Sequence, residues 1–271
     1  MKKKNSSIKN SNKLQTFRKI TWQLMRADLR VIVKDIKDKW INALLWGSCT
    51  LIVIAYIMPA FGLKDFGLFQ AASILISVIG FETYNQMFII VMNLEQRKYM
   101  FYLFTLPIPV ACIFFQKIMT YTINSMLISL FMIPLSKLIL LDQMNLATIN
   151  WTKLLFAITI SSFFFSCFLI FIVSFAKKTS QVEHIFMRVV FPLWFFGGFQ
   201  FSWQKLFEIN QYAAYCSLIS PYTYATEAVR VAFFGQAEFI QYWICITSML
   251  IGSAFFGIYG YKRLKKRLDL A

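Results

Sequence analysis

Residues 191–235 read FPLWFFGGFQFSWQKLFEINQYAAYCSLISPYTYATEAVRVAFFG. The first half is apolar enough to enter a bilayer. The second half is too polar to span one, yet it holds too many Tyr, Phe, Leu and Ile residues for an ordinary solvated loop. Segments of intermediate apolarity usually lie at the membrane interface or dip into the bilayer as re-entrant hairpins. We therefore expect this stretch to shape one surface of a membrane protein.

A helix start lies within the second half of this stretch. Ser220 is a good N-cap residue, and Pro221 suits the first helical position because its missing N–H would be unpaired there anyway. Gly235 is a natural C-terminal stop. A helix between these points carries Glu227 and Arg230 three residues apart, and therefore on one face.

The composition is that of a membrane protein. Of 271 residues, 58% are hydrophobic and 18% aromatic, and the mean hydropathy is +0.59. Soluble domains are about 45–50% apolar. The net charge of +16 does not indicate nucleic-acid binding, because the Lys and Arg residues flank apolar runs. Five cysteines without a C-x-x-C pair and a single histidine predict neither a disulfide framework nor a metal site.

Six apolar runs predict six membrane-spanning helices, so the expected fold is an all-α integral membrane protein. The runs cover about residues 41–61, 66–92, 110–135, 154–175, 185–201 and 239–261. Each is near the roughly 17–25 residues that a spanning helix requires. We expect residues 41–261 to form the transmembrane domain.

Basic segments flank this domain. Residues 1–15 are rich in Lys, Ser and Asn and are expected to be disordered, and residues 262–271 form a basic tail. In residues 16–40, apolar side chains recur every three or four positions between basic ones, which predicts an amphipathic helix along the cytoplasmic membrane surface. A solvated helix packed on the protein's own loops fits the same pattern.

The distribution of Lys and Arg predicts the orientation. With the N-terminus in the cytoplasm, the inner side holds 22 of these residues and the outer side five. This asymmetry favours both termini in the cytoplasm and places residues 191–235 outside.

The chain carries no phosphate-binding loop of the P-loop kind. Gly62 and Gly67 have the glycine spacing of that motif, but Leu68 stands where it requires Lys. We therefore expect that the chain does not hydrolyse ATP by itself.

The inner loop between the second and third runs combines charge with a short apolar stretch. Glu95, Arg97 and Lys98 precede the apolar residues 99–106, and Pro107 follows. This pattern predicts a short helix at the inner membrane surface, because proline ends helices. Such a helix can dock into a groove on a soluble partner, or it can be a plain amphipathic connector.

Glu82 lies in the middle of the second apolar run. A carboxylate at that depth is costly, so it must be paired, protonated or facing a cavity. It could line a substrate path, or it could join its helix to a neighbouring one.

These features together resemble the permease subunits of type-2 ABC exporters, a family that moves drugs, lipids and glycans outward. The resemblance covers nearly the whole chain after residue 16. The inner loop has the family's E-x-R start, apolar stretch, L-P-x-P/S and Lys, at Glu95, Arg97, Leu106, Pro107, Pro109 and Lys117. The outer segment has an apolar G-x-x-F stretch, then N/S-P-x-T-Y-A-x-E-A-x-R and a later Gly, at Gly198, Phe201, Ser220, Pro221, Thr223, Tyr224, Ala225, Glu227, Ala228, Arg230 and Gly235. Ser220 stands where Asn is commoner, but both residues cap helices.

The resemblance implies a role for each segment. Residues 16–40 would be an interface helix under the membrane, and residues 95–106 would hold a coupling helix that contacts an ATPase subunit. The residues implied in coupling are Glu95, Arg97, Lys98, Tyr99, Leu103 and Pro107. Residues 203–235 would be re-entrant helices that close the exit, with an outer gate formed by Ser220, Pro221, Tyr224, Glu227 and Arg230.

The implied working unit is an ABC exporter in the bacterial cytoplasmic membrane. Two permeases, identical or different, would form the path within membrane lipid, and two ATPase subunits would hold ATP and magnesium. This chain would bind no cofactor. The implied cargo is a hydrophobic drug, a lipid or a lipid-linked glycan, with a polysaccharide of the O-antigen type as the alternative.

Two other classes of protein fit the residues less well. A polytopic membrane enzyme of lipid or glycan metabolism would need several acidic or histidine residues converging at one membrane surface, whereas this chain offers scattered Glu residues. A channel or ion-coupled carrier would need more intramembrane charge than Glu82 and Lys117.

Overall fold

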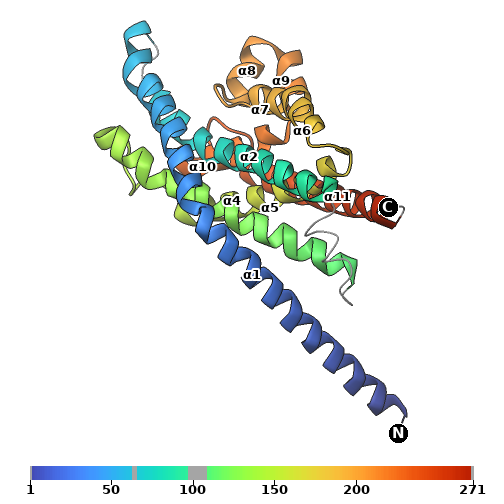
Figure 1. The fold of residues 1–271 in the computed structure, drawn as a ribbon. Helices are drawn as coiled ribbons and strands as arrows, with labels where there is room; N and C mark the ends of the chain where they lie inside the picture. The colour runs from blue at the N-terminus through green and yellow to red at the C-terminus, as the bar shows by residue number, and fades with distance from the viewer. Residues whose placement is uncertain (1, 63–65, 97–108, 270–271) are drawn as a thin grey trace.

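The structure is a computed structural model that describes residues 2–62, 66–96 and 109–269 (Figure 1). Within these ranges it consists of helices and their connections, without β-strands. The long helices are α1 (Lys2–Ile52), α2 (Phe66–Glu95), α4 (Val110–Leu140), α5 (Trp151–Val173) and α11 (Tyr242–Asp269). The shorter helices are α6 (Ser180–Ile185), α7 (Phe191–Phe196), α8 (Trp203–Ile209), α9 (Gln211–Ser217) and α10 (Pro221–Phe234). Tighter or wider turns join them at η1 (Val53–Ile57), η2 (Met58–Phe61), η3 (Leu141–Gln143) and η4 (Phe186–Val190).

Five helices in the described ranges are long and apolar enough to cross a membrane. They cover Lys19–Phe61, Phe66–Glu95, Val110–Leu140, Trp151–Val173 and Tyr242–Lys266. The prediction of an all-α membrane protein is therefore confirmed. The count of six spans stays a prediction.

The fifth predicted span, residues 185–201, differs from the other five. Helical structure runs from Ser180 to Phe196 through α6, η4 and α7, with π-type hydrogen bonding in the middle. Gly197 and Gly198 then end it, and Gly198 has a φ of +80°, a conformation that glycine adopts without strain. The glycine pair thus stops this helix short of the predicted end of the run.

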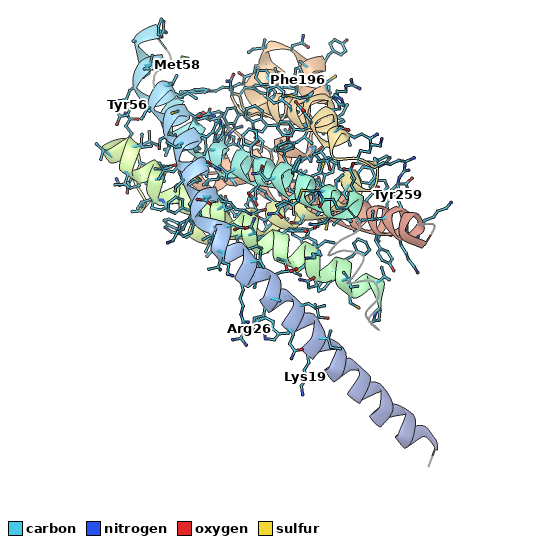
Figure 2. All side chains as sticks on the ribbon, in the orientation of Figure 1. Lys19, Arg26, Tyr56, Met58, Phe196 and Tyr259 are labelled. Carbon is cyan, nitrogen blue, oxygen red and sulfur yellow. The ribbon has the colours of Figure 1, made fainter. Side chains whose placement is uncertain are left out.

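The N-terminal segments form one helix rather than three parts. α1 passes without a break through residues 2–15 and 16–40 into the first apolar run, where it ends at Ile52 and η1 and η2 follow. The segment expected to be disordered is therefore helical in the structure. The reason lies in the sequence, which has no glycine before Gly47 and no proline before Pro59. The N-terminal part of α1, where Lys19 and Arg26 project, extends past the other helices (Figures 1 and 2). Whether residues 16–40 lie along a membrane surface stays a prediction.

The core of the bundle lies where α2, α4 and α5 pack on one another. α1 packs along α4, and α11 along α5 (Figure 1). Small residues allow the second of these contacts: a Cβ at Gly260 would lie 2.8 Å from the backbone of Phe171, and a Cβ at Gly252 would lie 2.7 Å from the Phe164 ring. Close van der Waals packing of this kind holds helices together within lipid. α10 packs against α2, α5 and α11 and thus lies inside the bundle.

Candidate functional site

α10 begins and ends as its sequence predicts. The Ser220 hydroxyl accepts a hydrogen bond from the Tyr222 N–H at 3.2 Å, Pro221 is the first helical residue, and Gly235 follows the last with a φ of +88°. The Ser220 hydroxyl also donates to the carbonyl of Leu193 in α7. The cap residue therefore fixes both the start of α10 and its contact with the preceding helix.

α10 lies against the first half of α2 and runs antiparallel to it. A Cβ at Gly80 would lie 2.3 Å from the Tyr222 hydroxyl, so the tyrosine ring occupies the space that glycine leaves. Near the other end of α10, the Arg230 Nη2 donates to the Ser73 hydroxyl at 2.7 Å. α10 has 14 residues. At about 1.5 Å per residue it is about 21 Å long, which is less than the roughly 30 Å of a bilayer core. α10 is thus a buried helix beside the first half of α2, too short to span.

Arg230 is fully buried and is held by groups of α2 and of the connection between α7 and α8. Its Nη1 donates to the Phe201 carbonyl at 2.8 Å, and its Nη2 donates to Ser73 of α2 and to the Gly198 carbonyl. The guanidinium lies over the ring of Phe69, with Cζ 3.8 Å from the ring centre. A buried guanidinium needs such contacts because nothing else replaces its lost hydration.

Glu227 is also fully buried and neutralises this charge. Its Oε1 lies 3.3 Å from the Arg230 Nη1 and accepts a hydrogen bond from the Trp203 N–H at 3.0 Å. Its Oε2 accepts from the Ile240 N–H at 3.1 Å. The pair therefore joins α10 to α2, to the start of α8 and to the segment before α11, and we call these contacts the outer brace.

The predicted outer-gate residues come together on this one element. Ser220, Glu227 and Arg230 hold α10 in place through contacts within the chain, whereas Tyr224 is half-buried on the same helix. Sequence reasoning missed the α2 residues Ser73 and Gly80, since neither residue type signals a distant partner. The gating role itself stays a prediction.

Glu82, the carboxylate predicted to be paired, protonated or facing a cavity, is paired. Its Oε1 lies 2.6 Å from the Lys39 Nζ of α1 and accepts hydrogen bonds from the Asn124 amide of α4 at 2.6 Å and the Gln86 amide at 2.5 Å. The Lys39 cluster, as we call Lys39, Glu82, Gln86 and Asn124, thus joins α1, α2 and α4. Glu82 also borders a cavity of about 280 Å³, and its role in lining a path stays a prediction.

A second ion pair joins α1 to α4. The Lys117 Nζ lies 2.5 Å from the Asp28 Oδ2, and the Gln116 amide donates to the same oxygen at 2.7 Å. Lys117, which lies in the third apolar run, is buried at 7% exposure. Sequence reasoning did not identify Asp28, although an aspartate among basic residues of an amphipathic helix is a usable signal.

Glu95 is the predicted coupling residue that the structure describes. Its Oε2 accepts hydrogen bonds from the N–H of Thr179 at 2.7 Å and from the Thr179 hydroxyl. These bonds tie the end of α2 to the segment just before α6. The other predicted coupling residues lie outside the described ranges: Arg97, Lys98, Tyr99, Leu103 and Pro107. The coupling role therefore stays a prediction.

Comparison with known proteins places the chain in a family. A family model described as ABC-2 type transporter matches residues 21–234, which is more than half of the chain. This range runs from α1 to the last residue of α10, and so includes the Lys39 cluster and most of the outer brace. A comparison with curated proteins gave no match. The chain therefore belongs to the ABC-2 type transporter family, as a membrane-spanning permease of an ABC transporter.

Proposed function

We propose that this permease forms half of an export path and is driven by a separate ATPase subunit that contacts the inner loop, residues 93–117. The cargo would be an amphiphile such as a hydrophobic drug, a lipid or a lipid-linked glycan. A second permease chain would complete the path. The absence of a P-loop motif from the sequence supports assigning ATP hydrolysis to the partner.

The observation that carries the proposal is the set of contacts along α2. Its last residue, Glu95, bonds to Thr179 beside the loop proposed for coupling. Its middle holds Glu82, which is paired to α1 and bonded to α4. Ser73, nearer its start, is bonded to Arg230 of α10. A helix of 30 residues is about 45 Å long and is stiff, so it can carry a displacement from the inner loop to the outer brace.

The chain's own residues would act as follows in transport. Closure of the ATPase subunits moves the inner loop and with it the end of α2. α2 and α10 move as one body, because the Arg230–Ser73 bond and the Tyr222–Gly80 contact join them. ATP shifts the equilibrium between the inward-open and outward-open arrangements only to the extent that the ATPase binds it differently in the two.

Purification of the chain with and without a co-expressed P-loop ATPase tests this function. We expect no ATP turnover by the chain alone, co-purification with the ATPase, and altered turnover by the complex. Inverted membrane vesicles should then accumulate cargo only with ATP. Transport by the chain in the absence of any such ATPase would overturn the proposal.

A charge reversal tests the coupling role separately. Exchanging the charges of Glu95 and Arg97 should uncouple ATP turnover from transport and leave the complex in the membrane. Glu183→Lys is the matched control, because Glu183 is an exposed carboxylate on the neighbouring helix α6, outside the inner loop. Normal transport by the reversed variant would refute the coupling role.

A further inference from the structure

A cavity of about 440 Å³ lies between α1 and the α2–α4 pair, on the inner side of the Lys39 cluster. Its size is within the range of small-molecule sites, about 300–1,000 Å³. Apolar side chains form much of the wall: Ala27, Val31, Ile32, Ile89 and Ile90. Val31 and Ile89 are also exposed on the surface of the bundle, so the cavity lies at that surface.

The polar part of the wall holds one carboxylate that has no ion-pair partner among the described side chains. Four charged side chains line the cavity: Asp28, Asp35, Lys39 and Lys117. Asp28 and Lys117 neutralise each other at 2.5 Å, and the Lys39 ammonium lies 2.6 Å from Glu82, outside this cavity. Asp35 is exposed and has no ion pair within 4.0 Å among the described side chains.

Helix geometry and the choice of partner by Lys39 explain why Asp35 has no ion-pair partner. Asp28, Asp35 and Lys39 fall on the face of α1 that meets α2 and α4, because they are spaced by seven and four residues. Lys39 could pair with Asp35 one turn away, but its ammonium points to Glu82 and to the Asn124 amide oxygen at 3.4 Å. The cavity therefore presents one uncompensated carboxylate beside an apolar wall.

We propose that this cavity binds a monovalent organic cation with an apolar body, with the cation near Asp35 and the body against Val31, Ile32, Ile89 and Ile90. The ligand would enter laterally from the lipid at the inner end of α2. That this ligand is transported as cargo rests on the proposed function. That it binds in the cavity does not. An anionic amphiphile is disfavoured, since it would face Asp35 with no unpaired cation in the described part of the wall.

The test uses two ions of nearly the same size and shape, tetraphenylphosphonium and tetraphenylborate. Binding of each to the full chain in nanodiscs is measured by equilibrium dialysis, with empty nanodiscs subtracted. The phosphonium ion should bind at least tenfold more tightly than the borate ion. Asp35→Asn should weaken phosphonium binding about tenfold, and Asp35→Glu should restore most of it.

Two further variants distinguish binding in the cavity from general effects of changing α1. Asp38→Asn removes a carboxylate from the same helix outside the cavity wall, and it should bind the phosphonium ion like the wild type. Ala27→Trp adds bulk at an exposed wall position and should block both ions. Equal phosphonium affinity in the wild type and Asp35→Asn would overturn the proposal, as would an equal loss in Asp38→Asn. Because no ATP or ATPase is present, this result is independent of whether the chain exports anything.

Discussion

The outer brace and the Lys39 cluster are both buried ion pairs, but they are built differently. In the outer brace, the two charges lie on one helix three residues apart, both are fully buried, and their remaining contacts include backbone groups. In the Lys39 cluster, the charges lie on different helices, the Lys39 side chain is 17% exposed, and cavities border it on both sides. The first arrangement holds one helix in a fixed place. The second joins α1 to the bundle through a partly exposed lysine, so we expect it to hold α1 less rigidly.

Removing one charge of the outer brace should give the largest loss of stability. Arg230→Met leaves the Glu227 carboxylate buried without a counter-ion, which costs about 3–5 kcal/mol for a buried pair. We expect a large drop in the thermal unfolding midpoint of the purified chain, or failure to accumulate in the membrane. Fluorescence-detected size-exclusion after heating measures either result.

A double substitution distinguishes lost charge balance from lost packing. Glu227→Gln with Arg230→Met removes both charges and keeps a carbonyl acceptor for the Trp203 or Ile240 N–H. It should be clearly more stable than Arg230→Met alone. If the double variant is as unstable as the single one, charge balance is not what the brace provides.

The Gly80–Tyr222 contact should give the next largest effect. Gly80→Ala places a Cβ 2.3 Å from the Tyr222 hydroxyl oxygen, so the buried Tyr222 ring, or α10 with it, must shift away from α2. Overpacking of this kind costs about 1–3 kcal/mol. The melting midpoint should fall, and combining Gly80→Ala with Tyr222→Ala should remove part of the strain.

Gly257→Ala is the matched control for that substitution. A Cβ at Gly257 would lie 3.5 Å from the Cys167 sulfur, an ordinary contact, so its midpoint should stay close to that of the wild type. An equal fall at Gly257 would mean that glycine is needed for general helix packing and not for the α2–α10 contact.

In the outer brace and the Lys39 cluster, contacts between residues close in sequence could be predicted, and contacts between distant residues could not. The start of α10 was predictable because Ser220, Pro221 and Gly235 are local signals within one helix. The need to pair Glu82 was also predictable from its depth. Its actual partners were not, because Lys39 lies 43 residues away and Asn124 lies 42 away. Ser73 and Arg230 are 157 residues apart, and a serine in an apolar run has many structural uses.

The departures from the predicted spans have similar causes. The end of the fifth helical segment is set by Gly197 and Gly198, which lie inside the apolar run and which apolarity alone does not reveal. The continuity of α1 depends on the absence of breakers, a weaker signal than the change in composition at residue 40. Patterns of composition therefore identified the elements better than their ends.

Loss of Glu82 should cost less than loss of Arg230 and should act mainly on α1. Glu82→Ala leaves the Lys39 ammonium and two amides without their shared acceptor, at a cost of about 1–3 kcal/mol. The cost stays below that of the outer brace because Lys39 can turn toward water. Spin labels at Ala27 of α1 and Phe115 of α4, both exposed, should show a broader distance distribution. An unchanged distribution would mean that the Lys39 cluster does not fix α1.

The smallest effect on stability is expected at the C-terminal end of α2, the end predicted to face the cytoplasm. Thr179→Val removes the hydroxyl that donates to Glu95 but keeps the N–H donor at 2.7 Å, so the joint between α2 and the segment before α6 is weakened and not lost. Because Glu95 is exposed, water can replace the missing donor, and the melting midpoint should stay within about 2 °C of the wild type.

If α2 transmits motion from the inner loop, transport per ATP hydrolysed should nevertheless fall in the complex with the ATPase. Glu95→Gln, which keeps an acceptor without the charge, should lower it further. Unchanged transport per ATP in both variants would separate the inner end of α2 from coupling and leave α2 with a structural role only.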